Sequence, residues 1–161
     1  MTGSRGASVR RVGHGAADAA TVARLLADYH AQTEAEKIAH GLREEGPLPE
    51  GYRREIDDPP AAFTGYAVYL AERDGAVLGM VAARADADGV EVKRLWVDPA
   101  ARGSGAGTAL LEAAAATGDG PVRLSVWESR ADALGLYESR GFTRAPSWET
   151  RPQLVCLIRI R

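Results

Sequence analysis

The 161-residue sequence is poor in several features, and each shortage excludes a class of protein. Its one cysteine, Cys156, excludes an internal disulfide and a cysteine-rich zinc site. No run of about 18 apolar residues occurs, so no membrane span is predicted. The formal net charge of −2 lacks the basic excess of nucleic-acid-binding proteins. No apolar stretch follows residues 1–8, so no signal peptide is predicted, and we expect a cytoplasmic location.

The residues that are present are typical of one globular domain. Apolar residues make up 45% of the sequence and charged residues 26%, which is the composition of an ordered chain. A chain of this length buries a core without a metal or a disulfide. We therefore predict a single domain over residues 1–161, in which residues 1–8 form a flexible tail. The abundance of alanine and the scarcity of lysine indicate a bacterial source.

The first part of the chain is expected to form one strand and then helices. The apolar segment Val9–Val12 is a candidate strand, and Asp18 is a candidate helix cap. The apolar residues that follow repeat at i, i+3, i+4 and i+7, which predicts one buried helix face; they are Val22, Leu25, Leu26 and Tyr29. Residues 33–60 are acidic and interrupted by prolines, and we predict one or two short helices there.

Strand patterns dominate the remainder of the chain. Asp74-Gly75 is a two-residue turn signal that predicts a hairpin. Ser129 and Asp132 occupy capping-box positions before the last predicted helix, and Gly141 follows it as a stop. The predicted strands are Tyr66–Arg73, Ala76–Arg84, Val90–Val97, Val122–Trp127 and Leu154–Ile160, and the predicted helices are Ser104–Ala116 and Ala131–Ser139. The order β-α-α-β-β-β-α-β-α-β predicts an α/β fold, with helices on both faces of a central mixed sheet.

A glycine-rich loop, Arg102–Gly107, lies between the predicted strand Val90–Val97 and the next helix. Its three glycines let the backbone approach a ligand closely. The helix N-terminus behind them favours negative charge, and Arg102 adds a cation. The loop therefore suits a pyrophosphate, although a glycine-rich helix start that binds nothing has the same pattern.

Two other phosphate-binding patterns do not fit this loop. The dinucleotide pattern Gly-x-Gly-x-x-Gly, counted from Gly103, places Thr108 where its last glycine belongs. A Walker A loop requires a lysine directly after a glycine of the loop, and the only lysines are Lys37 and Lys93.

The residues around the loop resemble a known family. Glu91–Gly107, EVKRLWVDPAARGSGAG, resembles motif A of the Gcn5-related N-acetyltransferase (GNAT) superfamily, in which a strand and a short loop precede Arg/Gln-x-x-Gly-x-Gly/Ala at a helix start. Ala133–Phe142 resembles motif B of the same family, commonly Ala-x-x-Leu-Tyr-x-x-x-Gly-Phe. The resemblance covers residues 66–161 well and the first 60 residues loosely. The motif A strand is similar to that of small bacterial members, whose acceptors are often unassigned.

This resemblance implies an acetyl-CoA-dependent N-acetyltransferase in which a primary amine attacks the thioester directly. In the family, the strand before the loop bulges away from its neighbour and its backbone binds the pantetheine arm and the thioester carbonyl. The implied cofactor-binding residues are Leu95, Val97, Arg102, Gly103, Ser104, Gly105, Ala106, Gly107 and Thr108. The sequence departs from the family at Arg130, where an asparagine often contacts the pantetheine arm.

Tyr137 of motif B is the implied general acid for the leaving thiolate. A phenol has a pKa near 10 and a thiol near 8.5, so a hydrogen bond from Tyr137 to the sulfur still neutralises developing charge. The alternative is that Tyr137 only packs against its apolar neighbours, which are Leu134, Leu136 and Phe142.

Glu91 is the candidate general base, acting directly or through a water. Strand alternation predicts that Glu91 shares the acyl-binding face with Lys93, Leu95 and Val97. The alternative is a surface glutamate paired with Lys93 or Arg94.

The acceptor is expected to be a small amine. Tyr29 and His30, near the predicted end of the first helix, are candidate substrate residues because the family often builds its acceptor pocket there. The acids of residues 34–58 would attract a cationic amine, whereas the interleaved Arg43, Arg53 and Arg54 would bind a carboxylate. The histidines do not cluster at metal-ligand spacing, so no metal site is predicted, and each is expected to be solvated or on a helix surface.

Two questions stay open at the level of the sequence. One is whether the chain forms a homodimer. The other is whether it catalyses a reaction at all, because a non-catalytic acyl-CoA-binding sensor or partner domain would keep the same loop.

Overall fold

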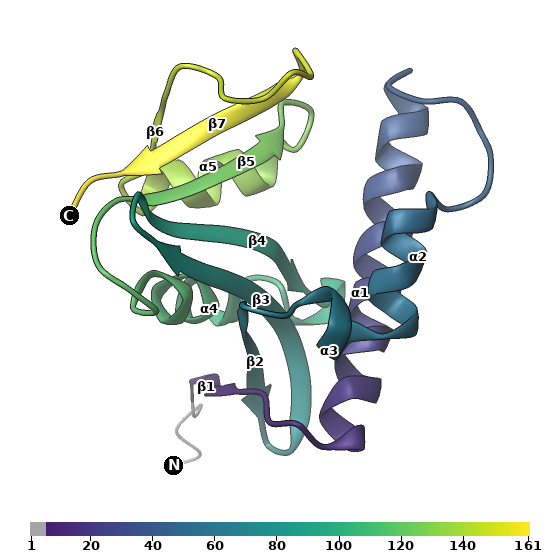
Figure 1. Ribbon diagram of the computed structural model, residues 1–161, viewed down its shortest axis with the longest axis vertical. Helices are drawn as coiled ribbons and strands as arrows, with labels where there is room; N and C mark the ends of the chain where they lie inside the picture. The colour runs from purple at the N-terminus through teal and green to yellow at the C-terminus, as the bar shows by residue number, and fades with distance from the viewer. Residues whose placement is uncertain (1–5) are drawn as a thin grey trace.

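The computed structural model describes residues 6–161, which are built around a seven-stranded sheet (Figure 1). The strands are β1 (Ser8–Arg11), β2 (Ala67–Arg73), β3 (Ala76–Asp86), β4 (Gly89–Val97), β5 (Val122–Trp127), β6 (Thr143–Arg144) and β7 (Leu154–Arg159). Their order across the sheet is β1-β2-β3-β4-β5-β7-β6. Strands β4 and β5 pair in parallel, and the other neighbours in this sheet are antiparallel. The predicted α/β fold with a mixed sheet is confirmed.

Helices cover both faces of the sheet (Figure 1). On one face lie α1 (Ala16–Ala39), α2 (Glu50–Asp57) and α3 (Pro59–Ala62), and the buried side of α1 packs on β2, β3 and β4. On the other face lie α4 (Ala106–Ala115) and α5 (Ala131–Ser139), whose apolar residues share one core with β4 and β5. A 3-10 turn, Pro99–Ala101, connects β4 to the glycine loop. Strand β4 therefore leads through this turn and the glycine loop into the N-terminus of α4.

Strand β4 contains a bulge at Arg94. Met80 of β3 faces Trp96 and Ala82 faces Lys93, so two residues of β4 oppose one residue of β3. Arg94 has a φ of 57°, in the left-handed region that is uncommon for a residue with a side chain. The bulge therefore depends on contacts that hold Arg94 in this conformation.

The bulge reverses the alternation of side chains along β4. Trp96 packs on the side of α1, together with Met80, while Leu95 and Val97 pack against the core on the side of α4. The expectation that Glu91 and Lys93 share a face with Leu95 and Val97 is therefore wrong. An extra residue in one strand shifts the two-residue period by one position.

Beyond the bulge, β4 and β5 separate. Their pairing joins Val90 to Val122 and Glu91 to Arg123, after which the two strands diverge (Figure 1). The N–H of Asp98 donates to the Leu78 carbonyl at 2.8 Å. Because hydrogen-bonded and non-bonded pairs alternate in an antiparallel ladder, the N–H of the preceding Val97 points away from β3 and into this gap.

The helix caps and the chain start differ from the prediction. The N-cap of α1 is Gly15, and Asp18 lies in the first turn, where its carboxylate binds Arg10 at 2.7 Å and accepts from the Gly13 N–H at 2.8 Å. The N-cap of α5 is Arg130, without a side-chain cap bond, so the predicted capping box is wrong. Of the predicted tail, residues 1–5 lie outside the described residues, and Ser8 already belongs to β1.

Three features of the elements were not predicted from the sequence. Helix α1 runs through Ala39, helix α3 occupies Pro59–Ala62, and the two-residue strand β6 pairs with β7. Within residues 6–161, no helix is long and apolar enough to cross a membrane.

Candidate active site

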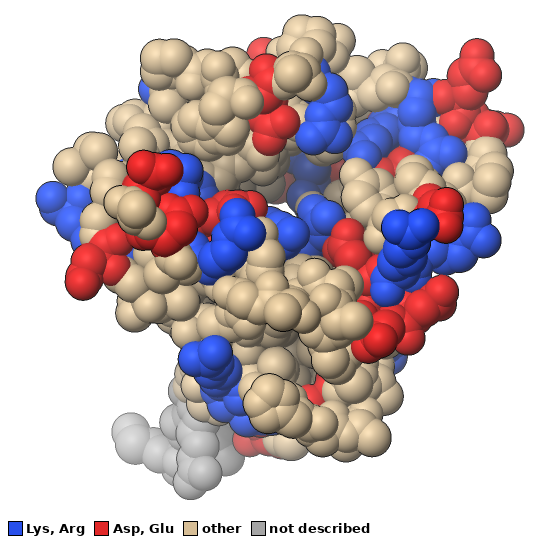
Figure 2. All heavy atoms as spheres, in the orientation of Figure 1, with Lys and Arg blue, Asp and Glu red and all other residues tan. Residues whose placement is uncertain are grey.

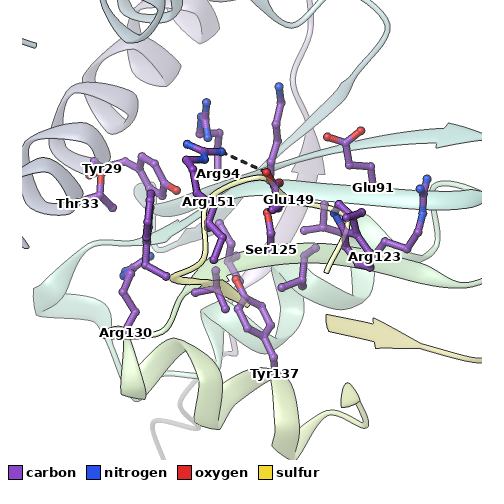
Figure 3. Close-up of a pocket in the computed structure, with 18 of the residues that line it drawn as sticks. Tyr29, Thr33, Glu91, Arg94, Arg123, Ser125, Arg130, Tyr137, Glu149 and Arg151 are labelled. Carbon is purple, nitrogen blue, oxygen red and sulfur yellow. Dashed lines mark hydrogen bonds and ion pairs between the residues drawn. The ribbon is translucent and has the colours of Figure 1, made fainter. Parts of the chain in front are cut away.

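Two cavities meet where β4 and β5 separate. The first, of about 420 Å³, lies between α1 and α2 on one side and β4, β5 and the loop before β7 on the other (Figure 3). The second, of about 560 Å³, lies between the end of β4, the glycine loop and α5. Leu95, Arg130 and Tyr137 line both cavities. The two cavities therefore adjoin at these three residues.

The glycine loop shapes the second cavity for an anion. Gly103 and Gly105 have φ values of 80° and 88°, and a Cβ built on either residue would meet nothing within 4 Å. The first backbone bond of α4 runs from the Ala109 N–H to the Gly105 carbonyl at 3.0 Å. Within residues 6–161, the N–H groups of Gly107 and Thr108 therefore have no backbone acceptor. Free N–H groups at a helix start suit a pyrophosphate, so the loop fits the group expected from the sequence.

The structure places seven of the nine predicted cofactor-binding residues around this cavity: Leu95, Val97, Arg102, Gly103, Gly105, Gly107 and Thr108. Ser104 and Ala106 are not among its lining residues. Ala106 is buried in the core, and the Ser104 hydroxyl accepts from the Ala106 N–H at 3.4 Å. The Arg102 guanidinium donates to the Val97 carbonyl at 3.2 Å and to Gln32 of α1 at 3.1 Å, so it is held across the rim of the cavity.

We expect that Gly105→Ala weakens the binding of coenzyme A about tenfold or more. Alanine is strained by about 1–2 kcal/mol at positive φ, and its methyl group would occupy the open space beside the α4 N-terminus. Calorimetric titration with coenzyme A measures the loss. Gly51→Ala in α2 is the matched control, because Gly51 is helical and exposed and should leave binding unchanged. Equal affinity of both variants would contradict the role of the loop.

Tyr137 of α5 packs in the core and also presents its hydroxyl to a cavity. Its ring is buried and packs edge-on against Phe142, with ring centroids 5.8 Å apart. Its hydroxyl points into the first cavity (Figure 3) and has no hydrogen-bond partner among the residues that the structure describes. Burial raises the pKa of Tyr137 above its usual value near 10. The phenol therefore stays protonated and is free to donate a hydrogen bond.

Glu91 lines the first cavity, but both of its oxygens already accept hydrogen bonds. Tyr66 donates to one oxygen at 3.2 Å and Arg84 binds the other at 2.7 Å. Glu91 lies four residues before Leu95, which is roughly 10–13 Å along a strand. A proton moving from an amine near Leu95 to Glu91 would therefore travel through water.

His30 is buried in the middle of α1, and the expectation of a solvated or surface histidine near the helix end is wrong for it. Its ring stacks on Tyr52 of α2, with centroids 4.2 Å apart, and its Nε2 lies 3.3 Å from Glu55. Tyr29 and His30, the predicted substrate residues, both line the first cavity. Within residues 6–161, no cluster of three or more histidine, cysteine or acidic side chains could hold a metal ion.

Arg94, at the bulge, forms a two-pronged ion pair with Glu55 of α2. Its Nε and one terminal nitrogen lie 2.8 and 2.9 Å from the two carboxylate oxygens. Burial alone would raise the pKa of Glu55, but hydrogen bonds from Arg94 and His30 outweigh burial and lower it to about 2. The pair joins α2 to the strained residue of β4 and so fixes one wall of the cavity.

The acids of residues 34–58 do not line the first cavity, contrary to the expectation from the sequence. Glu34 binds Lys37 and Arg43, each at 2.6 Å. Glu55 binds Arg94 at 2.8 Å, and Glu36 binds Arg130 at 3.3 Å. Arg43, Arg53 and Arg54 do not line the cavity either. The lining instead includes seven lysines and arginines against three acids. In Figure 2, basic side chains gather in the hollow in the middle of this face.

The loop before β7 contributes side chains that the sequence did not single out. Trp148, Glu149 and Arg151 line the first cavity, and Glu149 binds Ser125 of β5 at 3.2 Å and Arg151 at 3.4 Å. No motif or spacing marks these residues, because they reach the site only through the pairing of β7 with β5.

Comparisons with known proteins agree with this geometry. Residues 64–144 match a family model described as the acetyltransferase (GNAT) domain. The chain is 41% identical over 87 residues to a mycothiol acetyltransferase of Thermomonospora curvata, covering 51% of this chain and 29% of that protein. It is also 41% identical over 109 residues to a mycothiol acetyltransferase of Thermobispora bispora, covering 59% of this chain and 35% of that protein. The chain thus spans about a third of the length of these relatives.

The fold resembles many solved acetyltransferases. One is the PaiA N-acetyltransferase of Thermoplasma acidophilum in complex with coenzyme A, with a TM-score of 0.72 and 16% sequence identity. The likeness covers 96% of this chain and 99% of that chain, and it supports the fold alone.

Proposed function

Since this chain belongs to the GNAT acetyltransferase family, we propose that it transfers the acetyl group of acetyl-CoA to the primary amine of a small molecule. The observation that carries the proposal is the meeting of the two cavities at Leu95, Arg130 and Tyr137. The cavity of the glycine loop would hold the coenzyme, and the cavity under α1 and α2 would hold the acceptor. Bound acetyl-CoA supplies an activated acetyl group as a thioester.

Different residues would act in different steps of the transfer. The amine nitrogen forms a bond to the acetyl carbon while the carbon–sulfur bond breaks and the sulfur leaves as a thiolate. The Val97 N–H points into the gap between β4 and β5, where it would stabilise negative charge on the thioester oxygen. The Tyr137 hydroxyl would donate a hydrogen bond to the leaving sulfur. The amine loses a proton, which Glu91 would accept through water.

We expect that Glu91→Gln lowers kcat/KM for the amine by about 10²-fold, because a positioned base contributes an effect of this order. The acid limb of the pH profile should change as well, because glutamine cannot accept the proton that the amine loses. Steady-state kinetics between pH 5 and 10 measure both effects. Glu149→Gln is the comparison variant, since Glu149 is another carboxylate on this cavity. If Glu91→Gln keeps the wild-type profile and Glu149→Gln does not, Glu149 is the base.

The relatives suggest one further candidate acceptor to test. Both are mycothiol acetyltransferases, so a mycothiol-related amine belongs among the candidates. The shared segment is a minor part of those proteins, and the acceptor cavity here also uses α1 and α2. A small molecule fits the proposal because a cavity of about 420 Å³ is of the size that binds small ligands.

One assay tests the proposal against a non-catalytic acyl-CoA-binding domain. Purified protein is mixed with acetyl-CoA and a panel of amines, and release of free thiol is followed. The panel covers polyamines, amino acids, aminoglycosides, N-terminal peptides and a mycothiol-related amine. Amine-dependent thiol release is expected, and its absence despite tight binding of acetyl-CoA would identify a binding domain. Failure of both coenzyme A and acetyl-CoA to raise the Tm would exclude both readings.

A further inference from the structure

The first cavity has more basic than acidic side chains on its lining, and one of these cations differs from the rest. Six of them have a carboxylate partner within 3.4 Å: Lys37, Arg84, Arg94, Arg123, Arg130 and Arg151. Among residues 6–161, no carboxylate lies within ion-pair distance of the seventh, Lys93. Its ammonium instead lies 4.3 Å from the ring centroid of Tyr66 and 5.4 Å from that of Phe63. Of the seven cations on this lining, Lys93 is therefore the one without a carboxylate partner among the residues that the structure describes.

The surroundings of Lys93 do not satisfy its charge. The side chain is half-buried against aromatic rings, so water solvates the ammonium incompletely. Burial lowers the pKa of Lys93, and the neighbouring Arg94 lowers it further, so that the pKa falls although the charges of Glu91 and Glu55 act to raise it. An anion placed in the cavity beside Lys93 would relieve both effects.

The carboxylates near Lys93 do not act as its anionic partner. Both oxygens of Glu91 are held by Tyr66 and Arg84, and Glu55 is held by Arg94. Asp86, on the same lining, binds Arg123 at 3.0 Å. Each acid close to Lys93 is thus committed to another cation, and the lysine remains available to a ligand.

We propose that the acceptor is an amine that carries an anionic group, a carboxylate or a phosphate, which binds to Lys93. This inference rests on the proposed function, because it assigns the rest of the acceptor whose amine reaches the junction. Lys93 lies two residues before Leu95, which is roughly 6 Å along the strand. The amine and the anionic group are therefore separated by several bonds. A polyamine would place its second positive charge beside the Lys93 ammonium, so the proposal predicts that polyamines are poor acceptors.

Matched pairs of amines test the proposal. The first pair is 4-aminobutyrate and butylamine, and the second is 2-aminoethyl phosphate and ethanolamine, with putrescine as the dication. For at least one pair, kcat/KM for the anionic member is expected to exceed that for its neutral partner by about tenfold or more. A difference in the first pair alone indicates a carboxylate, and a difference in the second pair alone indicates a phosphate. Equal values within both pairs, or a preference for putrescine, would overturn the proposal.

Variants of Lys93 provide a second test of the proposal. Lys93→Met is expected to raise KM for the anionic amine by about 10- to 100-fold, and to affect kcat/KM for the neutral partner much less. Lys93→Arg should restore most of the loss because it keeps the charge. Arg144→Met, which removes a cation from the exposed strand β6, is the matched control and should behave as wild type. Equal loss for both members of a pair would show that Lys93 serves the fold and not the anion.

Calorimetric titration separates this inference from the proposed function. The anionic amine is titrated into the protein in the presence of coenzyme A, so that no turnover is needed. Binding that is lost in Lys93→Met, without thiol release in the kinetic assay, would support the anion site and contradict acetyl transfer. Thiol release with amines of every charge, together with no effect of Lys93→Met on binding, would contradict the anion site and support acetyl transfer.

Discussion

Replacement of Tyr137 by phenylalanine is expected to lower kcat by about 10²-fold while leaving the fold and the KM for acetyl-CoA nearly unchanged. The magnitude is that of a positioned proton donor. The ring packs against Phe142, and phenylalanine keeps this contact. The hydroxyl has no hydrogen-bond partner within residues 6–161, so its loss breaks no bond in the folded protein. A large change in rate with a small change in stability separates a catalytic hydroxyl from a packing residue.

The pH dependence of kcat adds a second test of Tyr137. Burial raises the pKa of Tyr137 above its usual value near 10, so the phenol stays protonated throughout the range in which the assay works. The alkaline side of the kcat profile should therefore show no loss from Tyr137 up to about pH 10. The raised pKa also makes full proton transfer to a thiolate, with a pKa near 8.5, more uphill. The phenol then acts through a hydrogen bond, and the sulfur takes its proton later from solvent.

The control for this experiment is Tyr69→Phe. Tyr69 of β2 shares a hydrogen bond with Thr117 at 2.9 Å and lines neither cavity. Its replacement should lower stability slightly and leave kcat unchanged. If Tyr137→Phe also leaves kcat unchanged, Tyr137 is a packing residue and the leaving thiolate needs no donor from α5.

The glycine loop and the strand order were predictable because they depend on local properties of the sequence. Gly103 and Gly105 adopt positive φ, a conformation that glycine reaches without strain. The helices and strands of the second half, except β6, follow turn signals and apolar periods that need no knowledge of the tertiary structure. Their bounds consequently agree with the sequence to within two residues.

The bulge in β4 could not be located in this way. It places Arg94, a residue with a side chain, at a φ of 57°, and no glycine marks the position. The partner that holds it, Glu55, lies 39 residues earlier in the chain. A simple two-residue alternation therefore assigned Leu95 and Val97 to the wrong face, because the register shift at Arg94 has no mark in the local sequence.

The charge of the first cavity was misjudged for a similar reason. Counting acids in residues 34–58 predicts an acidic wall, because the sequence does not show which acids are already paired. In the structure, Glu36 binds Arg130 and Glu55 binds Arg94, and both cations come from distant elements. The lining of the cavity therefore has more basic than acidic side chains.

Replacement of Glu55 by glutamine is expected to lower the free energy of unfolding by about 3 kcal/mol, the low end of the range for breaking a buried pair. Arg94 would keep its charge with only 20% of its side chain exposed and would lose both hydrogen bonds to the carboxylate. Urea unfolding at pH 7 measures the change. Glu50→Gln in the same helix is the matched control, because Glu50 and Arg54 form a pair that is 74% exposed on each side. Its effect should stay within about 0.5 kcal/mol.

Acid should reproduce the effect of this substitution in the wild-type protein. Because the pKa of Glu55 falls from about 4.3 in the unfolded chain to about 2 in the folded protein, its contribution is complete above pH 4.3. The contribution then decreases as the pH falls towards 2, by about 3 kcal/mol in total. The stability difference between wild type and Glu55→Gln should shrink over this interval. A difference that stays constant between pH 5 and 2 would show that Glu55 stabilises the protein by packing rather than by charge.

The same substitution should also lower kcat, since Arg94 is held at the bulge by Glu55. When the ion pair is lost, the strained conformation of Arg94 has less to stabilise it. The position of the Val97 N–H in the gap beside β5 depends on that conformation. We expect kcat to fall about tenfold or more while the affinity for coenzyme A, which depends on the glycine loop, changes little. An unchanged kcat despite the lost stability would mean that the bulge is maintained by the sheet alone.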